Sequence, residues 1–108
     1  MWATFGLSFL GLHRFNRFIL IVDDEENILS AFRRQLRREF NLETANSGQE
    51  ALDILGTQGP FAVIVTDYRM PKMDGVQFLK LAQEIFPHAV RIMLTGQADL
   101  NTAIEAVN

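Results

Sequence analysis

The sequence predicts a doubly wound α/β fold, in which helices cover both faces of a parallel sheet. Three apolar runs rich in Ile and Val, at residues 18–22, 62–66 and 90–94, have the composition of buried parallel strands. Segments with helical periodicity separate the strands, and this alternating order indicates right-handed crossovers. With 108 residues, 48% of them hydrophobic, the chain is long enough for one domain with a single core.

The first strand is predicted at residues 18–22 and is followed by a helix at residues 27–38. We expect Ile28, Phe32 and Leu36 to form the buried stripe of this helix, because they recur at helical spacing. Its arginines are interpreted as a solvent-exposed face rather than as a phosphate site. They are Arg33, Arg34, Arg37 and Arg38.

The second strand, at residues 40–45, differs from the others because apolar and polar side chains alternate along it. This pattern is typical of a strand with one solvated face, and it places the strand at an edge of the sheet. A helix is predicted next, at residues 48–55. Ser47 and Glu50 have capping-box spacing at its start, and Gly56 is expected to end it.

A loop at residues 68–74 follows the third strand. Asp74, at the end of this loop, is expected to cap a helix that reaches about Ile85 and stops before Pro87. The fourth strand comes next. A last helix is expected to begin near residue 98 or 99 and to continue to the final residue.

Residues 1–17 differ from the rest of the chain because they are apolar and contain no acidic residue. Their apolar run is shorter than the roughly 20 residues that a spanning helix needs, and it lacks the basic start of a signal peptide. We therefore predict an apolar N-terminal extension before a domain at residues 18–108. A docking role is a second interpretation, because four large apolar side chains would share one helical face. These are Trp2, Phe5, Phe9 and Leu12.

The composition excludes several kinds of function. The formal net charge of −3 gives no sign of general nucleic-acid binding. The chain has no cysteine, which excludes disulfide bonds, thiolate zinc sites and thiol nucleophiles and is compatible with a cytoplasmic location. The two histidines, His13 and His88, are isolated and do not have the spacing of metal ligands.

Polar side chains directly follow three of the apolar strands. Asp23 and Asp24 come after the first strand, Asp67 after the third and Thr95 after the fourth. Open α/β sheets build their binding sites at these strand ends, so we expect the side chains to converge. Three neighbouring carboxylates repel one another unless one is protonated or a cation lies among them. Oxygen ligands of this kind favour Mg²⁺, and the metal suggests phosphate chemistry.

Asp67 is the best candidate for a nucleophile, because it stands alone after the most apolar central strand. A carboxylate can accept a phosphoryl group as an aspartyl phosphate. In this hypothesis Asp23 and Asp24 hold the metal, and Thr95 donates its hydroxyl to the phosphate oxygens. Each feature alone is more often a helix cap or a turn residue, whereas their combination on neighbouring strands favours a site.

Three segments together resemble the receiver domain of bacterial two-component response regulators, which has a flavodoxin-like fold. They are residues 19–25 (ILIVDDE), 67–75 (DYRMPKMDG) and 92–96 (IMLTG). The resemblance covers residues 18–108 without obvious gaps. It implies that Asp67 is the phosphoacceptor, that Thr95 is the switch hydroxyl, and that Mg²⁺ is the cofactor. The implied metal ligands are Asp23, Asp24, Asp67 and the backbone carbonyl of Arg69.

The resemblance also implies how the acceptor loop is built and what the domain serves. Pro71 and Gly75 would shape the loop, and for Met70 and Met73 packing in the core is the stronger interpretation. The implied function is a switch in phosphorelay signal transduction, phosphorylated by a sensor histidine kinase and acting on an output domain or effector protein. Such a domain is cytoplasmic, contacts neither nucleic acid nor membrane directly, and is not an enzyme with a substrate of its own.

The sequence departs from the family pattern after the fourth strand. The fifth strand, the last helix and the fifth strand's lysine are missing, so a truncated receiver is expected. The two lysines present, Lys72 and Lys80, are not placed to replace that lysine. We expect weak or absent phosphorylation, and self-association through the exposed fourth strand or the N-terminal segment.

Two alternative functions compete with the signalling switch. The first is a phosphorylation-independent interaction module, in which the fold persists while the missing lysine disables the switch. The second is a phosphatase of the haloacid-dehalogenase type, which also uses an aspartate nucleophile. That family places its nucleophile after the first strand in a D-x-D arrangement, which residues 23–26 (DDEE) do not match well.

Overall fold

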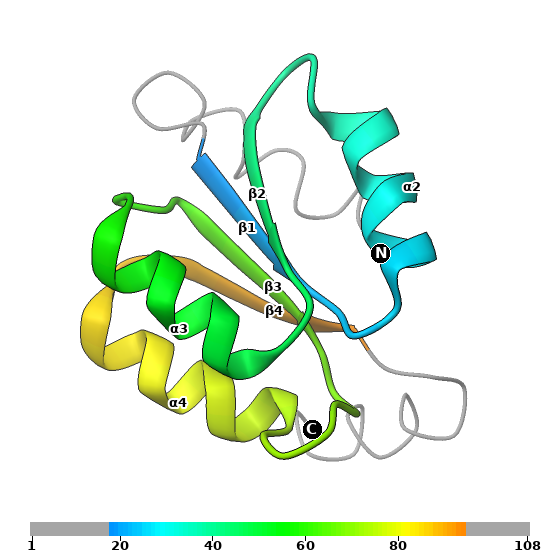
Figure 1. Cartoon of the computed structure of the whole chain (residues 1–108). Helices are drawn as coiled ribbons and strands as arrows, with labels where there is room; N and C mark the ends of the chain where they lie inside the picture. Colours follow the sequence, from blue (N-terminus) through cyan, green and yellow to red (C-terminus); the bar gives the residue numbers. More distant parts are fainter. Residues whose placement is uncertain (1–17, 95–108) are drawn as a thin grey trace, which may run out of the picture.

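The computed structural model describes residues 18–94 of the chain. Four parallel strands form one sheet in the order β2-β1-β3-β4. The strands are β1 (Phe18–Val22), β2 (Asn41–Ala45), β3 (Val63–Asp67) and β4 (Val90–Leu94), and the helices are α2 (Glu26–Leu36), α3 (Gly48–Thr57) and α4 (Gly75–Ile85). Helices α3 and α4 lie side by side on one face of the sheet, and α2 covers the other (Figure 1). The predicted doubly wound α/β fold is confirmed, as is the edge position of β2.

The two central strands, β1 and β3, are buried on both faces because side chains alternate in direction along a strand. Leu20, Val22 and Ile64 point into the core beneath α3 and α4. Ile21 and Val65, which are partners in the register, point into the core beneath α2. Continuous apolar sequence in these strands therefore reflects burial on both sides, as the sequence predicts.

Helix α2 presents a different face to the sheet from the one predicted. Leu29 is the buried residue, at 1% exposed, whereas Ile28 is 38% exposed. Phe32 and Leu36 are half-buried against the same core. Ile28 was thus wrongly placed in the buried stripe, because a shift of one residue turns the contact face by about 100°.

Four arginines lie in the last turns of α2 or directly after it. Arg34, Arg37 and Arg38 are exposed, as expected of a solvated face. Arg33 is instead half-buried, and its guanidinium donates hydrogen bonds to the side chains of Glu26 and Thr44. Its side chain is still 39% exposed, so it remains on a solvated face, but it also has partners that the sequence pattern does not indicate.

Helix α3 begins as predicted and ends later. The Ser47 hydroxyl accepts a hydrogen bond from the Glu50 N–H at 3.1 Å, and the Glu50 carboxylate accepts from the Asn46 N–H at 2.8 Å. Gly56 does not end the helix, which continues to Thr57. The residue that follows has extended backbone with φ of −132°, so this helix end does not require a glycine in the left-handed region.

Helix α4 begins and ends as the sequence predicts. The Asp74 carboxylate accepts from the Gln77 N–H at 2.8 Å, and the Gln77 side chain accepts from the Asp74 N–H at 3.0 Å. This reciprocal capping box determines where the helix starts, one residue after Asp74. The start matters for function because Gly75, the first residue of α4, contacts the end of β3.

Aromatic residues gather at the end of the sheet where the strands begin. The ring of Phe61 packs edge to face against Phe18 and Phe86, with ring centroids 6.1 Å apart in each pair. Phe61 is only 2% exposed. The preceding Gly59 has φ of +114°, and a Cβ there would lie 2.8 Å from the Phe86 ring. This end of the sheet is stabilised by burial and ring packing.

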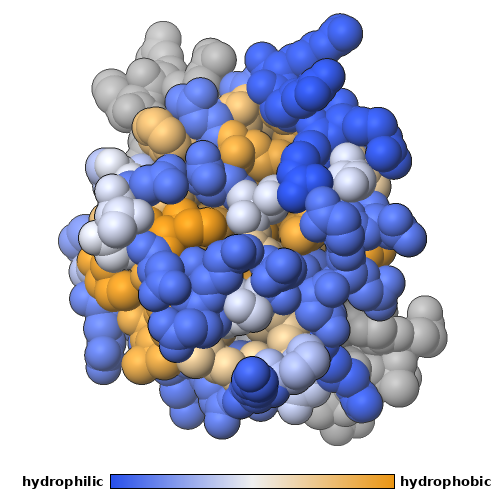
Figure 2. Space-filling model, in the orientation of Figure 1, coloured by the Kyte–Doolittle hydropathy of each residue, from blue (hydrophilic) through white to orange (hydrophobic). Residues whose placement is uncertain are grey.

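Polar residues cover most of the visible surface, with apolar residues showing between them (Figure 2). Leu81 and Ile85 of α4 are each 41% exposed. No helix among residues 18–94 is long and apolar enough to cross a membrane. The predicted N-terminal extension and the predicted last helix lie outside the described residues.

Candidate functional site

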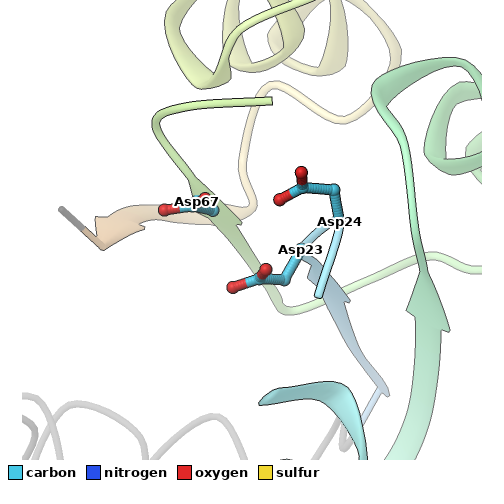
Figure 3. A group of neighbouring side chains, drawn as sticks. All are labelled: Asp23, Asp24 and Asp67. Atoms are coloured by element: carbon cyan, nitrogen blue, oxygen red, sulfur yellow. The ribbon is translucent and has the colours of Figure 1, made fainter. Parts of the chain in front are cut away.

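The C-terminal ends of β1 and β3 bring three carboxylates together. Val22 and Thr66 are partners in the parallel register, so the residues that follow them lie at the same edge of the sheet. Asp23, Asp24 and Asp67 surround one space there, and each offers a carboxylate oxygen within 4.8 Å of the others (Figure 3). Thr95, the fourth residue of the predicted cluster, lies outside the described residues.

The backbone and side chain of Asp23 are both held in place. Its N–H donates to the Ala45 carbonyl at 3.0 Å, which ties the end of β1 to the end of β2. Its carboxylate accepts a hydrogen bond from the Glu25 N–H at 2.9 Å. Aspartate side chains that bond the backbone two residues ahead stabilise a turn, so Asp23 also shapes the loop that carries Asp24.

Asp67 is the last residue of β3, and the polypeptide around it is closely packed. The Thr66 hydroxyl donates to the Asp67 carbonyl at 2.9 Å, and the Tyr68 N–H donates to the Leu94 carbonyl at 3.0 Å. A Cβ on Gly75 would overlap the Asp67 carbonyl oxygen and lie 3.0 Å from the Cα of Tyr68. Only glycine allows α4 to start this close to the end of β3.

The loop between β3 and α4 is closed at its base and tight at its tip. At the base, the Gly75 N–H donates to the Tyr68 carbonyl at 2.8 Å. At the tip, Lys72 has φ of +70°, and the Met73 N–H donates to the Pro71 carbonyl at 2.7 Å. This combination describes a γ-turn, a strained conformation for a residue with a side chain.

The two loop methionines pack as the sequence predicts. Met70 is 8% exposed and belongs to the core beneath α3 and α4. Met73 is half-buried against the same core, and its side chain lies over Gly48, where a Cβ would come within 3.1 Å of the Met73 Cγ. The loop is therefore fixed from below by two thioether side chains that adapt their shape to the core.

Burial and mutual repulsion act on the carboxylates together. Burial raises the pKa of Asp67 above its ordinary value, and the neighbouring Asp23 charge raises it further. Burial also raises the pKa of Asp23, while the hydrogen bond from the Glu25 N–H opposes this rise. Both shifts mean that the folded chain tolerates these negative charges poorly at neutral pH.

The donor set fits a hard divalent cation. Mg²⁺ prefers oxygen ligands, keeps several of its waters, and is usually held by one or two carboxylates. The cluster offers three carboxylates at a rim where Asp24 is exposed and Asp23 is only 9% exposed. A cation there would remove the repulsion that raises the Asp67 pKa.

A groove of about 460 Å³ joins the carboxylates to helix α2. Its polar end contains Asp23, Glu25 and Asp67. The rest of its lining comes from one face of α2 and the end of β4, and includes Ile28, Ala31, Phe32, Gln35 and Leu94. The sequence does not reveal this groove, because helical periodicity places Ile28 in the core. Only the exact rotation of α2 shows that Ile28 is exposed.

The model of the response regulator receiver domain family matches residues 19–108. The chain is 43% identical over 90 residues to the hydrogenase transcriptional regulatory protein HoxA of Cupriavidus necator, a match over 83% of this chain and 18% of that regulator. It is 40% identical over 97 residues to the regulatory protein AtoC of Escherichia coli, covering 82% of this chain and 19% of AtoC. The chain thus spans less than a fifth of the length of these two regulators.

Solved structures show the same fold. A response regulator receiver domain protein of Clostridium thermocellum is 38% identical, with a TM-score of 0.73 over 83% of this chain and 73% of that one. A protein described as an adenylate cyclase of Rhodopirellula baltica is 45% identical, with a TM-score of 0.79 over 86% of this chain and 69% of that one.

Proposed function

The chain belongs to the response regulator receiver domain family, and from that premise we propose that it is a phosphorylation switch with Asp67 as the phosphoacceptor. The observation that supports this most strongly is the cluster of three carboxylates at the ends of β1 and β3. The family fold is that of a signalling domain. In the proposal, residues 18–108 form the receiver and residues 1–17 an extension.

The proposed reaction transfers a phosphoryl group from a histidine of a sensor kinase to Asp67. A carboxylate oxygen of Asp67 attacks phosphorus in line with the phosphorus–nitrogen bond, which breaks and returns its electron pair to the histidine. A Mg²⁺ ion held beside Asp67 would supply positive charge that offsets the charge of the transferred group. We propose that Asp23, Asp24, Asp67 and the backbone carbonyl of Arg69 hold this ion.

The groove beside the carboxylates supports a protein phosphodonor. Its apolar walls give a partner helix something to pack against, and its polar end contains the proposed acceptor itself. A histidine presented by that helix would reach Asp67 from the side of α2. Because Ile28 is 38% exposed at this groove, it is a candidate contact for the kinase.

The role of Thr95 and the downstream partner are proposed from the sequence and its relatives. Thr95 would donate its hydroxyl to the phosphate on Asp67 and thereby report phosphorylation to the segment that follows. Phosphorylation replaces one negative charge by about two and adds strong acceptor oxygens, which is the change that Thr95 would detect. HoxA is named as a transcriptional regulatory protein and AtoC as a regulatory protein, so we propose an output domain or effector protein as the downstream partner and the cytoplasm as the location.

The direct test is incubation with acetyl phosphate, with and without Mg²⁺, followed by intact-mass measurement. We expect only a slow and partial gain of the mass of one phosphoryl group, in line with the weak phosphorylation predicted from the sequence, and only when Mg²⁺ is present. Asp67→Asn should abolish the addition, whereas Asp53→Asn, on the exposed side of α3, should not. Modification at another residue, or equal modification without Mg²⁺, would contradict the assignment of Asp67.

A phosphorylation-independent interaction module is the second candidate function. One observation favours it: no cationic side chain lines the described part of the groove that contains Asp67. A site without a nearby cation stabilises added phosphate less well. Unchanged kinase or effector binding by Asp67→Asn, together with no phosphoryl gain in the mass test, would support this alternative.

We also propose that the chain self-associates through β4. Among residues 18–94, β4 pairs only with β3, and its apolar residues Val90, Ile92 and Leu94 are half-buried. If the β4 strands of two copies paired antiparallel about Ile92, the two Ile92 side chains would be the only like residues opposite each other. If two β2 strands paired about their centre, Glu43 would lie opposite Glu43, and like charges directly opposite each other are destabilising. Light scattering tests this proposal: a monodisperse monomer would contradict it, and Ile92→Lys should reduce any dimer.

A further inference from the structure

One arginine joins the first turn of α2 to the edge strand β2. The guanidinium of Arg33 donates to the Glu26 carboxylate at 2.8 Å from one nitrogen and to the Thr44 hydroxyl at 2.8 Å from another. The nitrogen that contacts Glu26 also lies 3.4 Å from the Ser30 hydroxyl. Arginine's planar fork can hold two such partners at once.

A second link runs from the same acidic loop to the same strand. The Asp23 N–H donates to the carbonyl of Ala45, the residue directly after Thr44. Residues 23–26, all of them acidic, are therefore held at both ends by the last two residues of β2. Strand β2 contributes no residue to the carboxylate cluster, yet it carries both attachments of the loop that supplies Asp23 and Asp24.

We propose that Arg33 is a positioning residue for the metal-binding loop, acting through Glu26 and Thr44. This inference rests on the proposed Mg²⁺ site. Four consecutive acidic side chains repel one another, and Arg33 neutralises the last of them while tying it to the sheet. The Asp23 and Asp24 carboxylates are then oriented before the ion arrives, so less ordering of the loop is needed when the ion binds.

The sign of one measurement separates positioning from simple electrostatics. Removing a positive charge near a cation site strengthens cation binding, because repulsion between the two cations is lost. Loss of positioning weakens binding instead. The ion pair itself is solvent-exposed, with the two side chains 39% and 64% exposed, so its direct effect on folding stability is small.

The test is Mg²⁺ titration of the whole chain, followed by NMR shifts of the backbone amides. We expect Arg33→Gln to raise the Kd about threefold, within the effect of removing an outer partner of a metal ligand through an exposed pair. Arg34→Gln is the matched control, because it removes the same charge from the adjacent, exposed position. It should leave the Kd unchanged or lower it.

A second variant tests the other end of the link without changing charge. Thr44→Val removes only the hydroxyl that accepts from Arg33 and should raise the Kd about twofold. In the double variant with Arg33→Gln, the two effects should be less than additive, because both substitutions break the same link. This variant keeps the test decisive even if Arg33→Gln fails to fold.

The outcomes separate this inference from the proposed function. Equal Kd values for Arg33→Gln and Arg34→Gln, with Mg²⁺ still bound by the wild-type chain, would overturn the positioning role alone. Absence of any Mg²⁺-dependent shift at Asp23, Asp24 and Asp67 in the wild-type chain would overturn the metal site and the positioning role together. A raised Kd for Arg33→Gln and Thr44→Val, but not for Arg34→Gln, supports the inference.

Discussion

The two ends of the parallel sheet are built from opposite kinds of residue. Where the strands begin, Phe61 packs edge to face between Phe18 and Phe86 and is almost fully buried. Where they finish, Asp23 and Asp67 gather with Asp24, and burial raises the pKa of the first two. One end stabilises the fold, while the other reduces its stability but presents the oxygen ligands that the proposed Mg²⁺ ion would need. Substitutions should therefore be able to change stability at one end without changing the site at the other.

The largest change in the free energy of unfolding is expected where the strands begin, in the aromatic cluster around Phe61. Phe61→Ala removes a ring that is 2% exposed and should lower the free energy of unfolding by about 3–5 kcal/mol. The Mg²⁺ affinity of the folded chain should not change, because a strand of this length separates the ring from the carboxylates. Urea denaturation at several Mg²⁺ concentrations measures both quantities. Phe61→Leu, a milder change, serves if the alanine variant is unfolded, and a changed Mg²⁺ affinity in either variant would break the comparison.

The next effect is at the junction of β3 and α4. Gly75→Ala introduces a Cβ that overlaps the Asp67 carbonyl, and it should cost about 1–3 kcal/mol of stability and displace Asp67, the proposed phosphoacceptor. Phosphoryl gain from acetyl phosphate should therefore fall more than the folded fraction does.

Gly56→Ala is the control for this substitution. Gly56 lies inside α3 with no atom within 4 Å of an added Cβ, so alanine should stabilise the chain by about 0.5–1 kcal/mol. Its phosphoryl gain should match the wild type. If Gly75→Ala and Gly56→Ala lowered the phosphoryl gain equally, the cause would be a general response of helices to alanine and not the contact with Asp67.

A smaller effect of opposite sign is expected at the acidic end. Asp67→Asn removes one of three clustered charges, so without Mg²⁺ it should raise the free energy of unfolding by roughly 1 kcal/mol, the repulsion of two carboxylates ~4 Å apart in water. The wild-type chain should gain about 2.7 kcal/mol when Mg²⁺ is at 100 times its Kd, and the variant should gain far less. Thermal denaturation with and without Mg²⁺ measures this, with Asp53→Asn as the charge-matched control.

The smallest effect is the pH dependence of the stability difference between Asp67→Asn and the wild-type chain. Because the pKa of Asp67 is raised in the folded state, the folded chain binds the proton more tightly than the unfolded chain does. The destabilisation by the ionised Asp67 carboxylate is complete at pH values above its raised pKa. It disappears as the pH falls below the ordinary pKa of aspartate. The stability advantage of Asp67→Asn should therefore shrink steadily on acidification. An advantage that grows as pH falls would show that repulsion at Asp67 is not its cause.

Strand positions could be predicted from the sequence because the central strands are buried on both faces. Such strands leave continuous apolar runs, as in β1 and β3, and β2 shows its edge position by alternation. The convergence of Asp23 with Asp67 followed from this order, since neighbouring parallel strands finish at the same edge. The capping box at Asp74 was local and therefore also predictable.

Features that depend on exact orientation could not be predicted in the same way. The rotation of α2 that buries Leu29 and exposes Ile28 depends on packing against β1 and β3, which periodicity resolves only to within a residue. The partners of Arg33 lie 7 and 11 residues away, one of them on another element, so no local pattern indicates them. Helix α3 continues past Gly56 because it ends through extended backbone at Gln58 and not through a glycine in the left-handed region, which the sequence does not show.

The burial of β1 and β3 on both faces also predicts how the molecule opens. Amide hydrogens of these strands should exchange with solvent only in the most extensive opening, because apolar side chains cover them on each side. The tip of the following loop, at Pro71 and Lys72, is exposed and strained, so the Lys72 amide hydrogen should exchange through small local fluctuations. Asp67 lies between these two regions. Its carboxylate should thus keep a fixed place at the end of the sheet while the tip of the neighbouring loop fluctuates without unfolding the domain.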